Sequence, residues 1–270
     1  VVRACWGFVN GHRAGSVGLF WRVVGWGLGG LLFATIGLLP TTFIILILYI
    51  ISSFLMLFLP NAEVEVLESE TNLEILLKGW KLVARDPRLR LFVSANLLEI
   101  FSNTIWVSSI ILVFVTELLN ETESYWGYSN TAYSIGIIIS GLIAFRLSEK
   151  FLAAKWESIL FPLVAMAIVT LTILYFPNAQ MFLLFSALVG MLSQLKEVPE
   201  SVFLQETVEE NHLVNVYSVL EVISTLSFSV FVLLMSYITE SFGISISFWL
   251  SAICLMIEAI LIYIRRDYFK

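Results

Sequence analysis

Six ionisable residues interrupt the long apolar runs of this sequence. An ionisable side chain at the centre of a bilayer costs about 2.5–3.5 kcal/mol on insertion scales, so it usually faces a cavity or a partner. Such residues are therefore the first candidates for binding a ligand or a proton. They are Arg22, Glu99, Lys196, Glu197, Glu221 and Glu258.

Glu99 has the most polar surroundings of the six. Asn96 and Asn103 lie three residues before and four residues after it, so the three side chains share one face of a helix. Trp106 continues the same face by one turn. This face is suited to line a cavity for an amphipathic or cationic solute, and its carboxyl is suited to bind and release a proton. A hydrogen-bond cluster between helices is the alternative interpretation.

Two further groups of polar residues lie in later apolar runs. Glu221 lies at a similar depth to Glu99 and has Ser218 and Ser224 within a helical turn, so it is a second candidate for the same role. Lys196 and Glu200 form an i, i+4 pair beside a proline. A gate salt bridge is possible there, but we expect a pair at the membrane surface whose lysine extends towards the headgroups.

The composition places the chain in a membrane. Hydrophobic residues make up 59% of the 270 residues, charged residues only 13%, and the mean hydropathy is +0.92. A soluble domain typically has about 25% charged residues. The cysteines, Cys5 and Cys254, and the histidines, His12 and His212, have no metal-ligand spacing. We expect no enzyme, cofactor or metal, and the net charge of −6 argues against nucleic-acid binding.

Eight segments have the length and hydropathy of a transmembrane helix, which needs about 20 mostly apolar residues. Turns are expected at Gly37–Pro40 and at Pro177–Asn178, where proline interrupts the apolar sequence. The fold class is therefore all-α and integral to the membrane. The segments are Ser16–Leu39, Thr41–Pro60, Leu91–Val115, Gly127–Leu147, Ser158–Phe176, Gln180–Val198, Val214–Thr239 and Ile244–Ile264.

A polar linker over residues 61–90 divides the chain into a part before it, 1–60, and a part after it, 91–270. Apolar residues recur in the linker at helical spacing, which predicts an amphipathic helix on the membrane surface. Lysine and arginine are absent from the alternate loops, 38–40, 117–123, 177–179 and 240–243. Because positive residues mark cytoplasmic loops, the linker and the C-terminus are expected on the cytoplasmic side.

Two helices, a long linker and six more helices resemble a transporter of the major facilitator type from its fifth helix onward. The segment Phe145–Lys155 resembles the cytoplasmic loop motif of that family, Gly-x-Leu-(Gly/Ala/Ser)-Asp-(Arg/Lys)-(Phe/Tyr)-Gly-Arg-Arg-Lys. Lys150 matches the basic position of the motif, and Glu149 replaces its aspartate. Arg146 stands at the variable second position. The motif glycines are replaced by Phe145 and Leu152.

Two other stretches carry the same resemblance. Gly25, Gly27, Gly29 and Gly30 resemble the end of an antiporter motif in the fifth helix, although close helix packing explains such glycines equally well. Residues 198–211, with a Gln-x-x-Val segment, resemble the loop after the tenth helix in macrolide-efflux and siderophore-exporter relatives.

The resemblance implies two six-helix bundles around a central cavity with alternating access. The second bundle is represented by 91–270 and the first by its last two helices. A proton-coupled exporter of drugs such as macrolides in the cell membrane is the first hypothesis, with Glu99 as the leading residue and the drug, protons and lipid as partners. The alternatives are a truncated, non-transporting membrane protein or scaffold, and an exporter of siderophores or other solutes. Because the twelfth helix of such proteins is often peripheral, we expect Glu258 to have no functional role.

Overall fold

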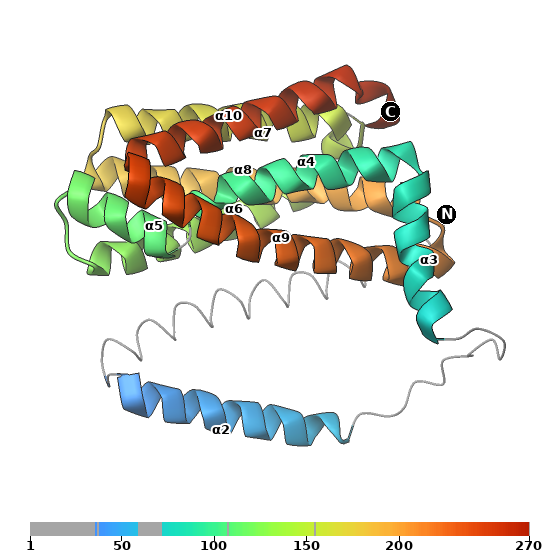
Figure 1. The fold of residues 1–270 in the computed structure, drawn as a ribbon, viewed down its shortest axis with the longest axis horizontal. Helices are drawn as coiled ribbons and strands as arrows, with labels where there is room; N and C mark the ends of the chain where they lie inside the picture. Colours follow the sequence, from blue (N-terminus) through green and yellow to red (C-terminus); the bar gives the residue numbers. More distant parts are fainter. Residues whose placement is uncertain (1–35, 37, 59–71, 107, 154, 270) are drawn as a thin grey trace. The chain divides into compact units, whose positions relative to one another are not determined.

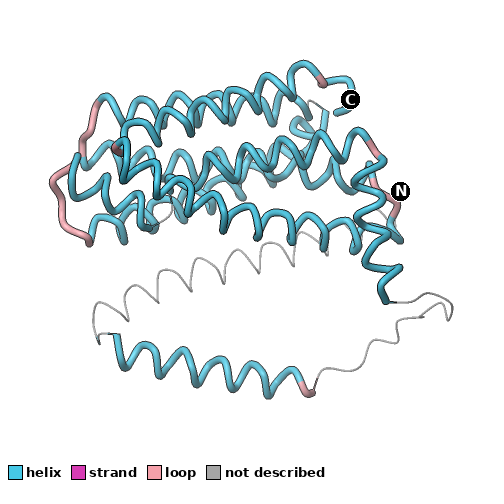
Figure 2. The backbone as a smooth tube through the Cα atoms, in the orientation of Figure 1, coloured by secondary structure: helices cyan, strands magenta, loops and turns pink. Residues whose placement is uncertain are grey.

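The computed structural model describes residues 36, 38–58, 72–106, 108–153 and 155–269. All regular secondary structure in these ranges is helical (Figures 1 and 2). The chain divides into two compact units, Val1–Glu70 and Thr71–Lys270. The boundary between them falls within the polar linker.

The described part of the first unit is the apolar helix α2, Leu38–Met56. It begins three residues before the predicted start at Thr41, so the turn expected at Gly37–Pro40 is wrong for its last three residues. Pro40 is accommodated because the first turn of a helix does not need its backbone N–H. The apolar part, Leu39–Leu55, is shorter than 18 residues, so its crossing of the bilayer remains a prediction. The predicted span Ser16–Leu39 lies almost wholly outside the described residues.

The second unit consists of eight α-helices and four short helical elements within its described residues. The short elements are the 3₁₀ turns η1 (Thr104–Trp106), η3 (Glu210–His212) and η4 (Arg266–Phe269), and a π-helical turn, η2 (Phe114–Leu118). The α-helices are α3 (Asn72–Arg85), α4 (Pro87–Asn103), α5 (Ser108–Val113), α6 (Ser124–Ala153), α7 (Lys155–Tyr175), α8 (Ala179–Thr207), α9 (Leu213–Phe242) and α10 (Ile244–Ile264).

Four of these helices, α7 to α10, are long and apolar enough to cross a membrane. A fifth span results if α4 with η1 and the segment Ile110–Leu118 count as one broken helix, bent by 43°. With 30 residues, α6 is also long enough to cross, and its assignment as a span remains a prediction. The fold is that of a multi-pass α-helical membrane protein.

The helix boundaries follow local signals in the sequence. The Asp86 carboxylate accepts a hydrogen bond from the backbone of Arg88 and caps α4, which then begins at Pro87. The Asn178 side chain caps α8 in the same way, so the break predicted at Pro177–Asn178 is confirmed. Between α9 and α10, Gly243 adopts a positive φ of 86°, which an L side chain rarely adopts.

The linker contains the helix α3, in the region where an amphipathic helix was predicted. This helix packs against α9 and α4 with Val83 buried, and its position on the membrane surface stays a prediction. Figure 1 shows α3 running across one end of the helix bundle, the end at which the C-terminus also lies. The loops before α6 and α8 lie at the opposite end (Figure 2).

Helices α6 and α8 form the closest contact of the bundle, and two glycines permit it. A Cβ atom on Gly136 would meet the backbone of Ala187, and one on Gly190 would meet the backbone carbonyl of Tyr133. Small residues let helix backbones approach in this way in membrane proteins. The crossing fixes the position of α6 side chains relative to α8.

Two sequence predictions about loops were wrong. The predicted span Gln180–Val198 continues as α8 to Thr207, so the segment that resembles a loop after the tenth helix is mostly helical despite Pro199. Likewise, the motif Phe145–Lys155 lies largely on the last turns of α6, which ends at Ala153. The glycines that the family motif has in this segment are absent here, and without them the helix has no local reason to stop.

Candidate functional site

A buried lysine surrounded by three carboxylates joins α4, α8 and α10. The Lys196 ammonium donates hydrogen bonds to Glu99 Oε2 at 2.6 Å and to Glu200 Oε1 at 2.7 Å. Its distance to Glu258 Oε1 is 3.7 Å. We call these four residues the ion cluster.

The four members differ in their access to the surroundings. The side chains of Lys196 and Glu258 are 1% and 0% exposed, whereas Glu99 and Glu200 are 14% and 15% exposed. Both carboxylate oxygens of Glu258 lack a hydrogen-bond partner. Burying charge without full compensation is costly, so this arrangement requires a specific explanation.

The three carboxylates have the spacing of a metal ligand set, since one oxygen from each lies within 4.8 Å of the others. The Lys196 ammonium, however, contacts all three of them. It therefore supplies the positive charge that a metal ion would otherwise provide at this position.

The face of α8 that carries Lys196 and Glu200 continues with further residues on the same side of the helix. Ser186, Val189, Ser193, Lys196 and Glu200 recur at spacings of three and four residues, which places them on the same side of the helix. Glu99 and Asn103 of α4 and Trp106 of η1 lie opposite this face, as the Glu99–Lys196 contact and the shared pocket lining show. Two polar helix faces thus meet inside an apolar bundle.

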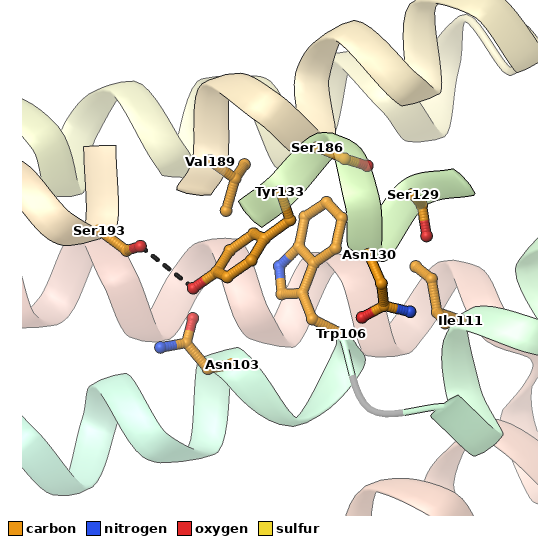
Figure 3. A pocket seen from close by; sticks show the side chains of 9 residues that line it. All are labelled: Asn103, Trp106, Ile111, Ser129, Asn130, Tyr133, Ser186, Val189 and Ser193. Atoms are coloured by element: carbon orange, nitrogen blue, oxygen red, sulfur yellow. Dashed lines mark hydrogen bonds between the residues drawn. The ribbon is translucent and has the colours of Figure 1, made fainter. Parts of the chain in front are cut away.

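An uncharged pocket of about 240 Å³ lies next to the ion cluster along these two faces. Asn103 follows Glu99 by one turn of α4, and Ser193 precedes Lys196 by one turn of α8. The Tyr133 hydroxyl of α6 and Ser193 Oγ are 3.1 Å apart and hydrogen-bonded (Figure 3). The lining consists of Asn103, Trp106, Ile111, Ser129, Asn130, Tyr133, Ser186, Val189 and Ser193.

The Trp106 ring, which lines this pocket, is supported from behind by other aromatic rings. The Trp106 ring stacks on Phe182 with a centroid distance of 6.4 Å and an interplanar angle of 5°. Phe182 in turn contacts Phe114, which stacks on Phe248 of α10 at 4.9 Å. Because Phe114, Phe182 and Phe248 are almost fully buried, the position of Trp106 is supported by packing.

Hydrogen bonds between helices hold α4 in place. Ser102 and Ser251 of α10 each donate to the other's backbone carbonyl, at 3.1 and 3.0 Å, and both are buried. On another face, Ser224 of α9 donates to Asn96 Oδ1 at 3.1 Å. These contacts orient the α4 face that carries Glu99.

The structure brings together most of the residues that the sequence singled out. Glu99, Lys196 and Glu200 meet in the ion cluster, Asn103 and Trp106 line the pocket, and Asn96 bonds to α9. Glu221 is exposed on α9 and does not belong to the cluster. The backbone of Arg146, Glu149 and Lys150 is helical, and nothing is described of their side chains; Gly25, Gly27, Gly29 and Gly30 lie outside the described residues.

Two expectations about charged residues were wrong. Lys196 and Glu200 are not a surface pair, since Lys196 is buried between two helices. Glu258 is not peripheral, because it faces Lys196 from α10 with no exposed surface. In both cases the neighbouring helices bury the side chain, and neither position along one helix nor the usual place of the last helix reveals this.

Some pocket residues were missed by the sequence analysis. Tyr133 and Asn130 lie on α6, in a stretch that was treated only as a membrane span. A signal was present on α8, where Ser186, Ser193 and Lys196 share a helical face in an otherwise apolar run. No comparable signal showed which face of α6 meets α8.

These helices and polar faces define a multi-pass membrane protein with a charged site inside its bundle. The chain belongs to the Major Facilitator Superfamily, whose family model matches residues 92–270. The chain is similar to two proteins of Bacillus subtilis (strain 168), each described as an uncharacterized MFS-type transporter. YfmI is 28% identical over 242 residues, which cover 88% of this chain and 60% of that protein. YjbB is 28% identical over 242 residues, covering 90% and 59%. This chain thus spans about 60% of the length of these relatives.

Proposed function

We propose that this chain is part of a secondary active transporter that exports amphipathic solutes, including drugs such as macrolides, in exchange for protons. The observation that carries the proposal is the position of the ion cluster, one helical turn from an uncharged pocket within a membrane bundle. One site offers groups that can bind protons, and the other offers groups that can bind a solute.

The pocket lining favours an amphipathic solute. Its amide and hydroxyl groups can form hydrogen bonds, while Trp106 and Ile111 provide apolar contact. A drug-sized ligand usually fills about 300–1,000 Å³, and this pocket of about 240 Å³ is smaller. It therefore suits one ring or side group of a larger solute. A cationic solute would find its counter-charge at Glu99, one turn away.

The proposed proton pathway begins at Glu99. Its side chain is 14% exposed and bonds to the buried Lys196, so it connects the cluster with the surroundings of the bundle. Gain of a proton at Glu99 would weaken its bond to Lys196 and loosen α4 from α8. Glu221, exposed on α9, is proposed as a second acidic group on this pathway, and Arg146, Glu149 and Lys150 as part of a loop that gates it.

The proposed setting is the plasma membrane, with the C-terminus in the cytoplasm. Apart from the buried Lys196, the lysines and arginines of the second unit belong to α3, to the start of α4, to the junction of α6 and α7 and to the C-terminus. Figure 1 shows α3 and the C-terminus at one end of the bundle. The loops at the other end, residues 119–123 and 176–178, contain no lysine or arginine. This distribution follows the rule that positive residues stay on the cytoplasmic side. The direction of transport and the macrolide substrate rest on the sequence resemblance.

The test is Glu99→Gln, which keeps the shape of the side chain and removes its charge. Drug efflux and its dependence on external pH are measured in cells with equal amounts of each variant in the membrane. We expect both to be lost in Glu99→Gln and retained in Glu240→Gln, a matched change at an exposed position of α9. Unchanged efflux and pH dependence in Glu99→Gln would show that Glu99 does not have this role.

A further inference from the structure

Glu258 is the carboxylate of the ion cluster that lies farthest from the Lys196 ammonium. It has no exposed surface, and neither of its oxygens has a hydrogen-bond partner. The short bonds of Lys196 go to Glu99 and Glu200, at 2.6 and 2.7 Å, while Glu258 is 3.7 Å away. The least accessible carboxyl group is thus the one that the lysine stabilises least.

The charges of the cluster do not balance if all groups are ionised. Three carboxylates carry three negative charges against one positive charge on Lys196. Glu99 and Glu200 retain some exposure and a direct bond to the lysine, so their charges are tolerable. A buried carboxylate without such a bond is normally neutralised.

Neutralisation by a metal ion conflicts with the geometry. The point near which the three carboxylates converge is already occupied by the Lys196 ammonium, which contacts an oxygen of each. A proton needs no such space, because it forms a covalent bond with one carboxyl oxygen. Among the described residues, the charged groups that face Glu258 are Glu99, Lys196 and Glu200, and the Cys254 thiol lies one turn before it on α10.

We propose that Glu258 holds a bound proton in this conformation and that Lys196 controls its release. Release occurs when the ammonium moves from Glu99 or Glu200 to Glu258 and takes over as its hydrogen-bond donor. The O–H bond of Glu258 then breaks, and the proton passes to the carboxylate that the lysine has left. The number of protons and the net charge of the cluster are unchanged by this exchange.

This proposal rests on the proposed function, because it assigns an internal proton site on α10 to a proton-coupled transporter. It adds that the proton is stored on Glu258 and that Glu99 exchanges it with the surroundings. The proton itself can be detected without any transport, so the two proposals can fail separately.

The experiment is infrared spectroscopy of the purified full chain in dodecyl maltoside, a detergent without ester carbonyls. The carbonyl stretch of a protonated carboxylic acid is separate from that of a carboxylate. At neutral pH we expect a protonated-carboxyl band in the wild type, loss of that band in Glu258→Gln, and retention in Glu240→Gln. In Glu258→Asp the band should shift in frequency, which keeps the test valid if the Gln variant does not fold.

Two results would overturn the proposal. One is the absence of the band in the wild type at neutral pH, and the other is an unchanged band in both Glu258 variants. Radioactive sodium is added as a further arm, because sodium bound by the wild type and not by Glu258→Gln would assign the site to a metal ion. Glu99→Gln should weaken the band, because Lys196 loses one of its two short bonds and is freer to move to Glu258.

Discussion

The ion cluster and the uncharged pocket lie on the same two helix faces, yet they hold the helices together in different ways. In the cluster, a single ammonium on α8 joins carboxylates from α4, α8 and α10. In the pocket, a hydroxyl hydrogen bond joins α8 to α6 and ring stacking joins α8 to Trp106 of η1, and none of the lining residues is charged. Charge is therefore concentrated where three helices converge, and neutral polar groups remain where a solute has room.

The largest effect is expected from removing the ammonium with Lys196→Met. The carboxylates of Glu99 and Glu200 would lose the ammonium to which they are hydrogen-bonded, and breaking a buried ion pair in this way costs about 3–5 kcal/mol. The free energy of unfolding in detergent is the measurement. The matched control, Lys81→Met on the exposed side of α3, should change it by less than about 0.5 kcal/mol. If the two variants are equally stable, the cluster does not hold the helices together.

A smaller effect is expected where α6 and α8 cross, since both helices line the pocket. In Gly190→Ala the new Cβ would meet the Tyr133 carbonyl, and the displacement of α6 should cost about 1–3 kcal/mol of unfolding free energy. Gly141→Ala on α6 is the control, because no atom lies within 4 Å of its Cβ position. That variant should be neutral or stabilised by up to about 1 kcal/mol. A harmless Gly190→Ala would mean that α6 and α8 are not in close contact.

The smallest effect concerns the hydrogen bond within the pocket. Tyr133→Phe and Ser193→Ala should each cost about 1 kcal/mol, because a typical hydrogen bond contributes about that much. The double variant should cost less than the sum of the two, with a coupling energy of at least about 0.5 kcal/mol. The free energies of unfolding of the wild type, the two single variants and the double variant give this double-mutant cycle. Strict additivity would show that the two hydroxyls act independently, and that the pocket is held by packing alone.

The sequence allowed most of the fold to be predicted, because the membrane helices are long apolar runs and capping residues mark the starts of α4 and α8. The break at Pro177–Asn178 and the amphipathic helix α3 are examples. The site was predicted only where one helix contains the whole pattern, as with Glu99 and Asn103. The position of Glu258 in the ion cluster was not predicted, because its partners are far away in the sequence. Only the packing of α10 on α4 brings them together. Pairings between helices leave no local pattern.

The bend between α4 and the segment Ile110–Leu118 separates these two regions mechanically. Glu99 lies on the straight part of α4, before the bend, and Ile111 lies after it, while Asn103 and Trp106 adjoin it. The bend of 43° therefore places Ile111, a pocket residue, and Glu99, a residue of the ion cluster, on different helical segments. Contact with a solute and ion pairing thus involve separate segments of this part of the chain.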